Sequence, residues 1–136
     1  MNKLFIIFIL TCTFASLTHA CVFTNKWHIF VMSDMPDNDL IAHVKSGDDD
    51  LGIHTIAFKG TYHWSFCQRF DGRTLFYAYF WCGSKFRSLA LFDKHIRKVC
   101  DRNKEGTQYC YWLVRPDGFF ASKRPDGGWV QLAVWS

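Results

Sequence analysis

Residues 61–70 (TYHWSFCQRF) and residues 73–82 (RTLFYAYFWC) stand on either side of Asp71-Gly72, and this stretch decides the fold class. Both runs are rich in aromatic residues and threonine, which favour strands over helices. Asp-Gly between two such runs is a strong signal for a two-residue turn, because both central positions of that turn need positive φ. The sequence therefore predicts an antiparallel β-hairpin here.

Short apolar runs separated by turn residues continue on both sides of this hairpin. Further strands are predicted at residues 27–32, 39–45, 51–58, 109–114, 119–122 and 129–135. Residues 86–92 fit either a strand or a helix, and the polar stretch 93–105 fits a loop or one helical turn. Such regular spacing is typical of a sandwich or barrel. We predict an all-β fold, a small antiparallel β-sandwich of seven to eight strands with at least one disulfide.

The N-terminus has the order of a secretory signal peptide. Lys3 precedes an apolar run at residues 4–10 (LFIIFIL), and Thr18-His19-Ala20 supplies small residues where a signal peptidase cleaves. The apolar run is shorter than the roughly 20 residues that a membrane-spanning helix needs. We therefore predict a signal peptide over residues 1–20, with Ala15 as a second cleavage point. One domain over residues 21–136 would then be secreted, without stable membrane insertion.

The charge pattern argues against a nucleic-acid partner. The formal net charge is +4, and lysines and arginines are scattered along the chain with acidic residues among them. A nucleic-acid-binding domain more often has a concentrated basic patch. Aromatic residues make up 18% of the chain, which is enough to fill a core and excludes global disorder.

The cysteines support export to an oxidising compartment. Cys12 lies in the leader, and five cysteines follow it: Cys21, Cys67, Cys82, Cys100 and Cys110. An odd number leaves one thiol free or joins two molecules by an intermolecular disulfide. In the predicted hairpin Cys67 and Cys82 are offset by roughly 20 Å at about 3.3 Å per residue, whereas a disulfide needs Cα atoms within about 7 Å. We therefore expect Cys21 to pair with Cys82 or Cys67.

Few residues suggest chemistry. Three adjacent acids, Asp48-Asp49-Asp50, provide the oxygen ligands that Ca²⁺ prefers. Adjacent side chains point in different directions, however, so a solvated turn with Asp side chains bonded to the backbone is the favoured interpretation. A protein-binding role ranks second and a metal site third.

No catalytic or cofactor site is expected. His28, His43, His54 and His63 lack the close spacing of zinc ligands. Ser65 has no G-x-S-x-G context. A secreted ribonuclease would use paired histidines, but nothing in the spacing specifies such a pair. We predict no catalytic residues, no metal and no cofactor.

The run Phe76-Tyr77-Ala78-Tyr79-Phe80-Trp81 has two different faces. In a sandwich one face of each strand lies in the core and the other is often solvated. Tyr and Trp are enriched at protein interfaces, so Tyr77, Tyr79 and Trp81 form a candidate partner surface. The polar loops at residues 34–39 and 97–107 are comparable candidates, because binding residues concentrate on loops.

Four motifs occur in a fixed order along the chain. They are Asp48-Asp49-Asp50-Leu51-Gly52-x-His54, Tyr62-x-Trp64-x-Phe66, Thr74-Leu75-Phe76-Tyr77-x-x-Phe80 and Cys110-x-Trp112-x-Val114-x-x-Asp117-Gly118. With them the chain resembles the plant self-incompatibility protein family, the S-protein homologues. The resemblance implies a secreted β-sandwich that acts as an extracellular signalling ligand and binds a cell-surface receptor without catalysis. The alternative is a secreted effector or defence protein acting on membranes or as a small hydrolase.

The resemblance also implies a disulfide pattern. One family bridge is retained as Cys100 and Cys110. The other family bridge joins a His-Cys-x-Ser segment to a Phe-x-Cys-x-Phe strand, and Val44 and Ala78 stand at those two positions here. Both cysteines are thus replaced together, and the apolar residues are expected to compensate in part by packing.

Overall fold

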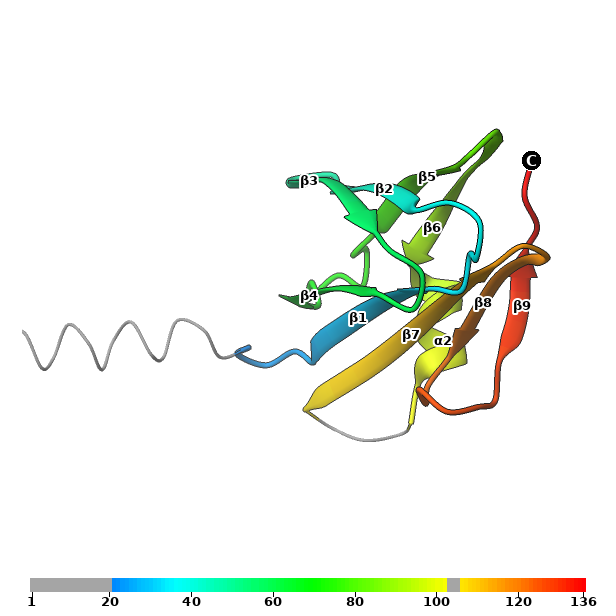
Figure 1. Cartoon of the computed structure of the whole chain (residues 1–136). Helices are drawn as coiled ribbons and strands as arrows, with labels where there is room; N and C mark the ends of the chain where they lie inside the picture. Colours follow the sequence, from blue (N-terminus) through cyan, green and yellow to red (C-terminus); the bar gives the residue numbers. More distant parts are fainter. Residues whose placement is uncertain (1–20, 103–105) are drawn as a thin grey trace, which may run out of the picture.

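The computed structural model describes residues 21–102 and 106–136, so the predicted signal peptide lies outside the described residues. Within these ranges the chain has nine strands and one short helix in two facing sheets (Figure 1). The larger sheet has the order β4-β1-β7-β8-β9 and the smaller one β3-β2-β5-β6. The strands are β1 (Lys26–Ser33), β2 (Leu40–Ser46), β3 (Asp50–Ile56), β4 (Thr61–Cys67), β5 (Phe76–Cys82), β6 (Lys85–Phe92), β7 (Thr107–Arg115), β8 (Gly118–Ser122) and β9 (Val130–Ala133). The predicted β-sandwich is confirmed, with nine strands in place of seven or eight.

The predicted hairpin around Asp71-Gly72 is wrong, because its two strands lie in different sheets. β4 pairs with β1, whereas β5 pairs with β2 and β6. A tight turn does occur, with Gly72 at φ +70° and its N–H bonded to the Arg69 carbonyl. Residues 68–75 use that turn to cross between the sheets. Phe76 of β5 then packs against Trp64 and Phe66 of β4 across the core, with ring centroids 5.7 and 4.5 Å apart.

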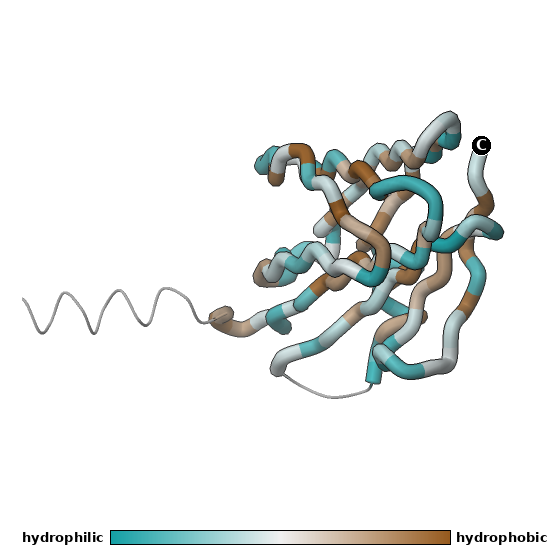
Figure 2. Tube along the Cα trace, in the orientation of Figure 1, coloured by the Kyte–Doolittle hydropathy of each residue, from teal (hydrophilic) through white to brown (hydrophobic). Residues whose placement is uncertain are grey.

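Strand β1 is central in the larger sheet and lies between an antiparallel and a parallel neighbour. It pairs antiparallel with β4 and parallel with β7, so the expected all-antiparallel arrangement has one exception. Trp27, Ile29 and Val31 are buried while the alternate residues are partly exposed, as the two-residue period of a strand requires. Hydropathy accordingly changes from residue to residue along the strands, and the connection from β1 to β2 is hydrophilic (Figure 2).

The two ambiguous segments are now assigned. Residues 86–92 belong to a strand, β6, and the stretch expected as a loop or one turn contains helix α2 (Lys94–Cys100). The helix begins where the Asp93 carboxylate accepts a hydrogen bond from the Ile96 N–H at 2.8 Å, which satisfies an otherwise unbonded backbone donor. Within the loop candidate at 97–107, residues 103–105 lie outside the described residues.

Candidate functional site

One face of β5 points out of the sandwich and carries its large polar aromatics. Phe76, Ala78 and Phe80 are buried, so the alternating side chains of Tyr77, Tyr79 and Trp81 lie on the opposite, solvent-facing side. The Trp81 side chain is 37% exposed, and both tyrosines are half-buried by their neighbours. Tyr79 lies next to both other rings, at centroid distances of 5.9 and 6.3 Å. The structure therefore places the three predicted residues in one continuous aromatic row.

Neighbouring strands extend this row into a patch that the sequence did not reveal. Ile41 of β2 is directly opposite Trp81, and Phe86 of β6 is opposite it on the other side, with the two rings 5.6 Å apart. Ile53 of β3 is 65% exposed and is opposite His43, which in turn pairs with Tyr79. We call this surface the outer patch; its members are Ile41, His43, Ile53, Tyr77, Tyr79, Trp81 and Phe86. Only strand pairing brings them together, because they are scattered over four strands.

The acidic run forms the turn between β2 and β3. The Ser46 N–H donates to the Asp49 carbonyl at 2.7 Å, and the Asp49 N–H donates to the Ser46 hydroxyl at 3.0 Å. Asp50 accepts hydrogen bonds from the Gly52 N–H and from His43, both at 2.8 Å. These two bonds, the backbone one first, lower the pKa of the Asp50 carboxyl. Asp50 thereby links the turn to the edge of the outer patch.

The next motif residues also have local structural roles. Gly52 has φ +85°, a conformation that favours glycine. The His54 ring bonds the Leu51 carbonyl at 2.6 Å and stacks on Tyr62 of β4 with centroids 3.8 Å apart. This contact joins the edge strands of the two sheets.

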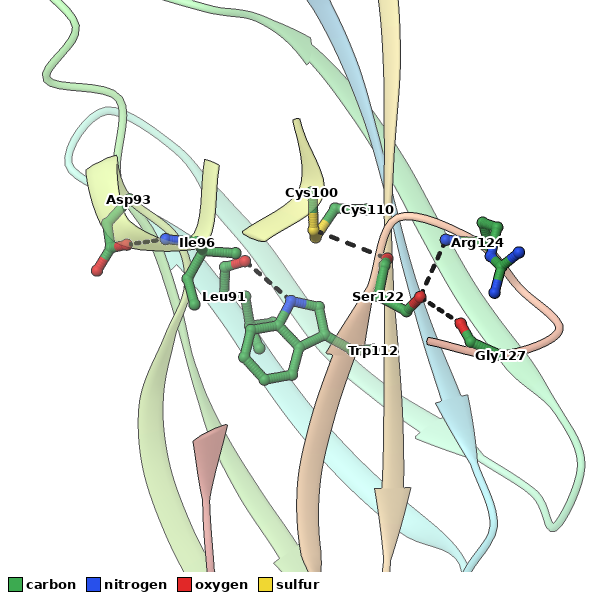
Figure 3. The surroundings of a disulfide bond; sticks show 9 residues. All are labelled: Leu91, Asp93, Ile96, Cys100, Cys110, Trp112, Ser122, Arg124 and Gly127. Atoms are coloured by element: carbon green, nitrogen blue, oxygen red, sulfur yellow. Dashed lines mark hydrogen bonds between the residues drawn. A yellow bond between two sulfur atoms is a disulfide. The ribbon is translucent and has the colours of Figure 1, made fainter. Parts of the chain in front are cut away.

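The tryptophans of the motifs belong to the core. Trp64 and Trp112 are buried, and Phe66 packs against the same cluster. The indole N–H of Trp112 donates to the Leu91 carbonyl at 2.9 Å, which connects β7 to the end of β6 (Figure 3). A buried indole N–H normally needs such a partner. These residues therefore belong to the sandwich core, although the buried indole N–H of Trp64 has no hydrogen-bond partner among the described residues.

Asp117 and Gly118 form the turn between β7 and β8. The Asp117 carbonyl accepts a hydrogen bond from the Gln131 side chain at 2.9 Å, and its carboxylate is 3.3 Å from Arg115. Gly118 has φ +143°, and a Cβ there would collide with the Ala133 carbonyl oxygen. The turn thus requires glycine for both conformation and space.

Two disulfides are present in the described part of the chain. Cys100–Cys110 ties α2 to β7 with Cα atoms 5.3 Å apart, and both residues are fully buried (Figure 3). Cys21–Cys67 ties the residue after the predicted cleavage point to the end of β4, with Cα atoms 5.4 Å apart. Cys21 therefore pairs with Cys67, which was one of its two predicted partners. The predicted hairpin, from which a Cys67–Cys82 bridge was excluded, does not form.

The remaining cysteine of the described residues, Cys82, is an unpaired thiol. It is 4% exposed and its Sγ lies 3.5 Å from the Asn38 carbonyl. Burial, followed by the nearby Asp39 carboxylate, raises the pKa of this thiol. The odd number of cysteines raised the prospect of an intermolecular disulfide. Such a bond through Cys82 is disfavoured, because the thiol is buried and its raised pKa keeps it protonated.

Val44 and Ala78 are direct cross-strand partners in β2 and β5, and both are fully buried. Opposite residues of antiparallel strands have Cα atoms about 4.5–5.5 Å apart, within the range of a disulfide. The two positions where the family bridge is replaced are thus adjacent in this chain as well, and an apolar pair fills the space.

The four histidines weighed in the sequence lie in three environments. His43 bonds Asp50 and His54 bonds a backbone carbonyl, whereas His28 and His63 come together on the outer face of the larger sheet with ring nitrogens 2.8 Å apart. The hairpin prediction placed His63 opposite Phe80, so the sequence could not show this pair.

Among residues 21–102 and 106–136, no helix is long and apolar enough to cross a membrane.

Comparisons with known proteins agree with this architecture. The chain is 38% identical over 80 residues to S-protein homolog 5 and 31% identical over 104 residues to S-protein homolog 2, both of Arabidopsis thaliana. These alignments cover 58% and 76% of this chain, and 57% and 64% of the relatives. A solved structure of a self-incompatibility protein homologue, from a group described as small, highly stable, secreted plant proteins, matches the fold with a TM-score of 0.60. That match has 18% identity and covers 83% of this chain and 96% of the other.

The sequence profile of the family described as plant self-incompatibility protein S1 matches residues 21–135, which is nearly the whole described domain. The chain belongs to the plant self-incompatibility protein S1 family.

Proposed function

We propose that this protein is a small extracellular signalling ligand of the self-incompatibility type, and that the outer patch binds a cell-surface receptor. The observation that carries the proposal is the exposure of Ile53, Trp81 and Phe86 on strands β3, β5 and β6 of the smaller sheet, at 65%, 37% and 38%. Interface cores are enriched in Tyr, Trp and Phe and depleted in charge. The outer patch has this composition, with Lys45 and Asp50 at its edge.

The geometry suits recognition rather than catalysis. The patch lies on a sheet, so its side chains are held in register by backbone pairing to both neighbours of β5. Residues with large rings and few rotatable bonds lose little conformational entropy when a partner binds them. The motif residues, by contrast, build turns and core contacts that keep this surface rigid.

The test is saturable binding of the labelled, secreted protein to intact plant cells, with unlabelled variants as competitors. Ile53→Asp and Trp81→Ala should compete much less effectively than the unchanged protein, because they charge or truncate the outer patch. Val130→Asp is the matched control: Val130 is 46% exposed and lies on β9 in the larger sheet, away from the outer patch. Equal competition by all variants would contradict the proposed surface.

The same preparations separate the ligand from a membrane-active or hydrolytic effector. Leakage of dye from liposomes, or ribonuclease activity that a single histidine substitution removes, would favour the effector and overturn the proposal. His28 and His63 bond each other directly, which leaves no room for a phosphodiester between them in this conformation.

A further inference from the structure

A histidine pair lies on the outer face of the larger sheet, on the opposite side of the sandwich from the outer patch. His28 is on β1 and His63 on the edge strand β4, where register places His28 opposite Ser65 and Phe30 opposite His63. The Nδ1 atom of His28 and the Nε2 atom of His63 are 2.8 Å apart, and the ring planes differ by 7°. One of the two nitrogens donates its proton to the lone pair of the other.

Neighbouring aromatic rings hold both imidazoles in place. His63 stacks on Phe30 with centroids 4.5 Å apart and planes 20° apart, and His28 stacks on Tyr109 at 5.2 Å and 18°. Phe30 also stacks on Tyr111 at 4.8 Å. The two nitrogens are therefore held next to each other, which lowers the entropy cost of binding an ion that bridges them.

We propose that His28 and His63 form a two-histidine chelate for a borderline divalent transition-metal ion such as Zn²⁺ or Cu²⁺. Imidazole nitrogen is a preferred ligand of these ions. With Zn–N bonds of about 2.0–2.1 Å and tetrahedral angles, the two nitrogens would separate to roughly 3.3–3.4 Å, about half an ångström beyond their present spacing. A small rotation of the exposed His63 ring provides that movement.

Metal binding requires both imidazoles to be neutral, and one of the two contacting nitrogens carries a proton in the pair. When the ion binds a neutral pair, the shared proton moves to the other nitrogen of its own ring, so no net proton is lost. The positive charge of Lys26 repels the cation and lowers the affinity of the two histidines for it.

Two protein ligands leave the rest of the coordination sphere open. No group of three or more His, Cys, Asp or Glu side chains gathers in the part of the chain that the structure describes. Water would complete the shell, and a donor from another molecule could replace it. The site departs from the expectation of no metal, because the two histidines are 35 positions apart in sequence.

The experiment is isothermal titration of the secreted, untagged protein with ZnCl₂ and with CuCl₂ above pH 7. We expect one ion per chain. His28→Gln and His63→Gln should each abolish saturable binding, whereas His95→Gln, an exposed position on α2, should leave it unchanged. Lys26→Gln should tighten binding, a gain that a misfolded variant would not produce.

Thermal unfolding provides the second readout. Added Zn²⁺ should raise the midpoint of the unchanged protein, because an ion that binds only the folded state stabilises it, but not that of His63→Gln. His63 is exposed on an edge strand, so this variant should fold even if His28→Gln does not. Absence of saturable binding would overturn the proposal, as would binding that survives both His substitutions or that is lost in His43→Gln.

Discussion

Gly118 shows how one residue can control the end of a sheet. Its conformation lets the chain turn from β7 into β8 while the Ala133 carbonyl of the C-terminal segment approaches closely. A side chain there would meet a backbone atom, which cannot move aside as a flexible side chain can. The position therefore contributes to stability without contacting any partner.

Gly118→Ala should lower the free energy of unfolding by about 2–4 kcal/mol, because it combines a strained φ with a backbone clash. Gly47→Ala is the matched control, since nothing lies within 4 Å of a Cβ at Gly47 and its φ is not positive. Urea unfolding of both variants measures the difference. Equal stability of the two would show that the turn relaxes freely.

The lowered pKa of Asp50 predicts that the protein loses part of its stability as the pH becomes acidic. Its pKa is lowered in the folded state, so the stabilisation is fully present above the ordinary carboxyl range and is lost as pH falls through the folded pKa. Asp50→Asn should thus be less stable than the unchanged protein near neutrality. The difference should shrink as pH falls below about 4, where the carboxyl becomes protonated. Urea midpoints measured across this range test it, and a difference independent of pH would contradict it.

At the level of elements, β2 and β5 are joined by packing at the two positions where the family resemblance implies a disulfide. Val44 and Ala78 lie opposite each other at the centre of this pairing, fully buried against the larger sheet. Large aromatic side chains such as Trp112 and Phe80 fill the neighbouring core.

The double variant Val44→Cys/Ala78→Cys should oxidise to a third disulfide and raise the free energy of unfolding by about 2–4 kcal/mol. Non-reducing peptide mapping should recover the bridge, and denaturant unfolding should show the gain. The two single variants are the controls, because each introduces one of the cysteines without forming the bond. Failure of the double variant to cross-link would mean that the two positions are farther apart than their register indicates.

Across the whole molecule, local sequence signals predicted where most strands lie but not which strands pair with each other. The turn at Asp71-Gly72 was real, yet the rings of Trp64 and Phe76 are buried against each other across the core, so the strands could not pair side by side. Pairing of β1 with β7 joins residues about eighty positions apart, which no short motif reveals. The outer face of β5 was predictable because alternation within one strand decides it. The His28–His63 pair was not, because it depends on the register between β1 and β4.

The single thiol of the described domain reports on global unfolding. Cys82 is buried and its raised pKa keeps it protonated, while the thiolate is the reactive form. A thiol reagent should label it slowly in native buffer and rapidly in denaturant. In a Cys82→Ala background, Ser84→Cys should label at once, because Ser84 is exposed in the adjacent turn. Prompt native labelling of Cys82, or a disulfide-linked dimer on a non-reducing gel, would contradict this expectation.

The position of β1 has a consequence for biosynthesis. The first strand of the described residues is an interior strand of the larger sheet, between a partner that follows about thirty residues later and one that follows about eighty residues later. Contacts that distant are slow to form. While the ribosome elongates the chain, one edge of β1 stays unpaired until residues 107–115 have emerged. The larger sheet can therefore form only after residues 107–115 are available to pair with β1.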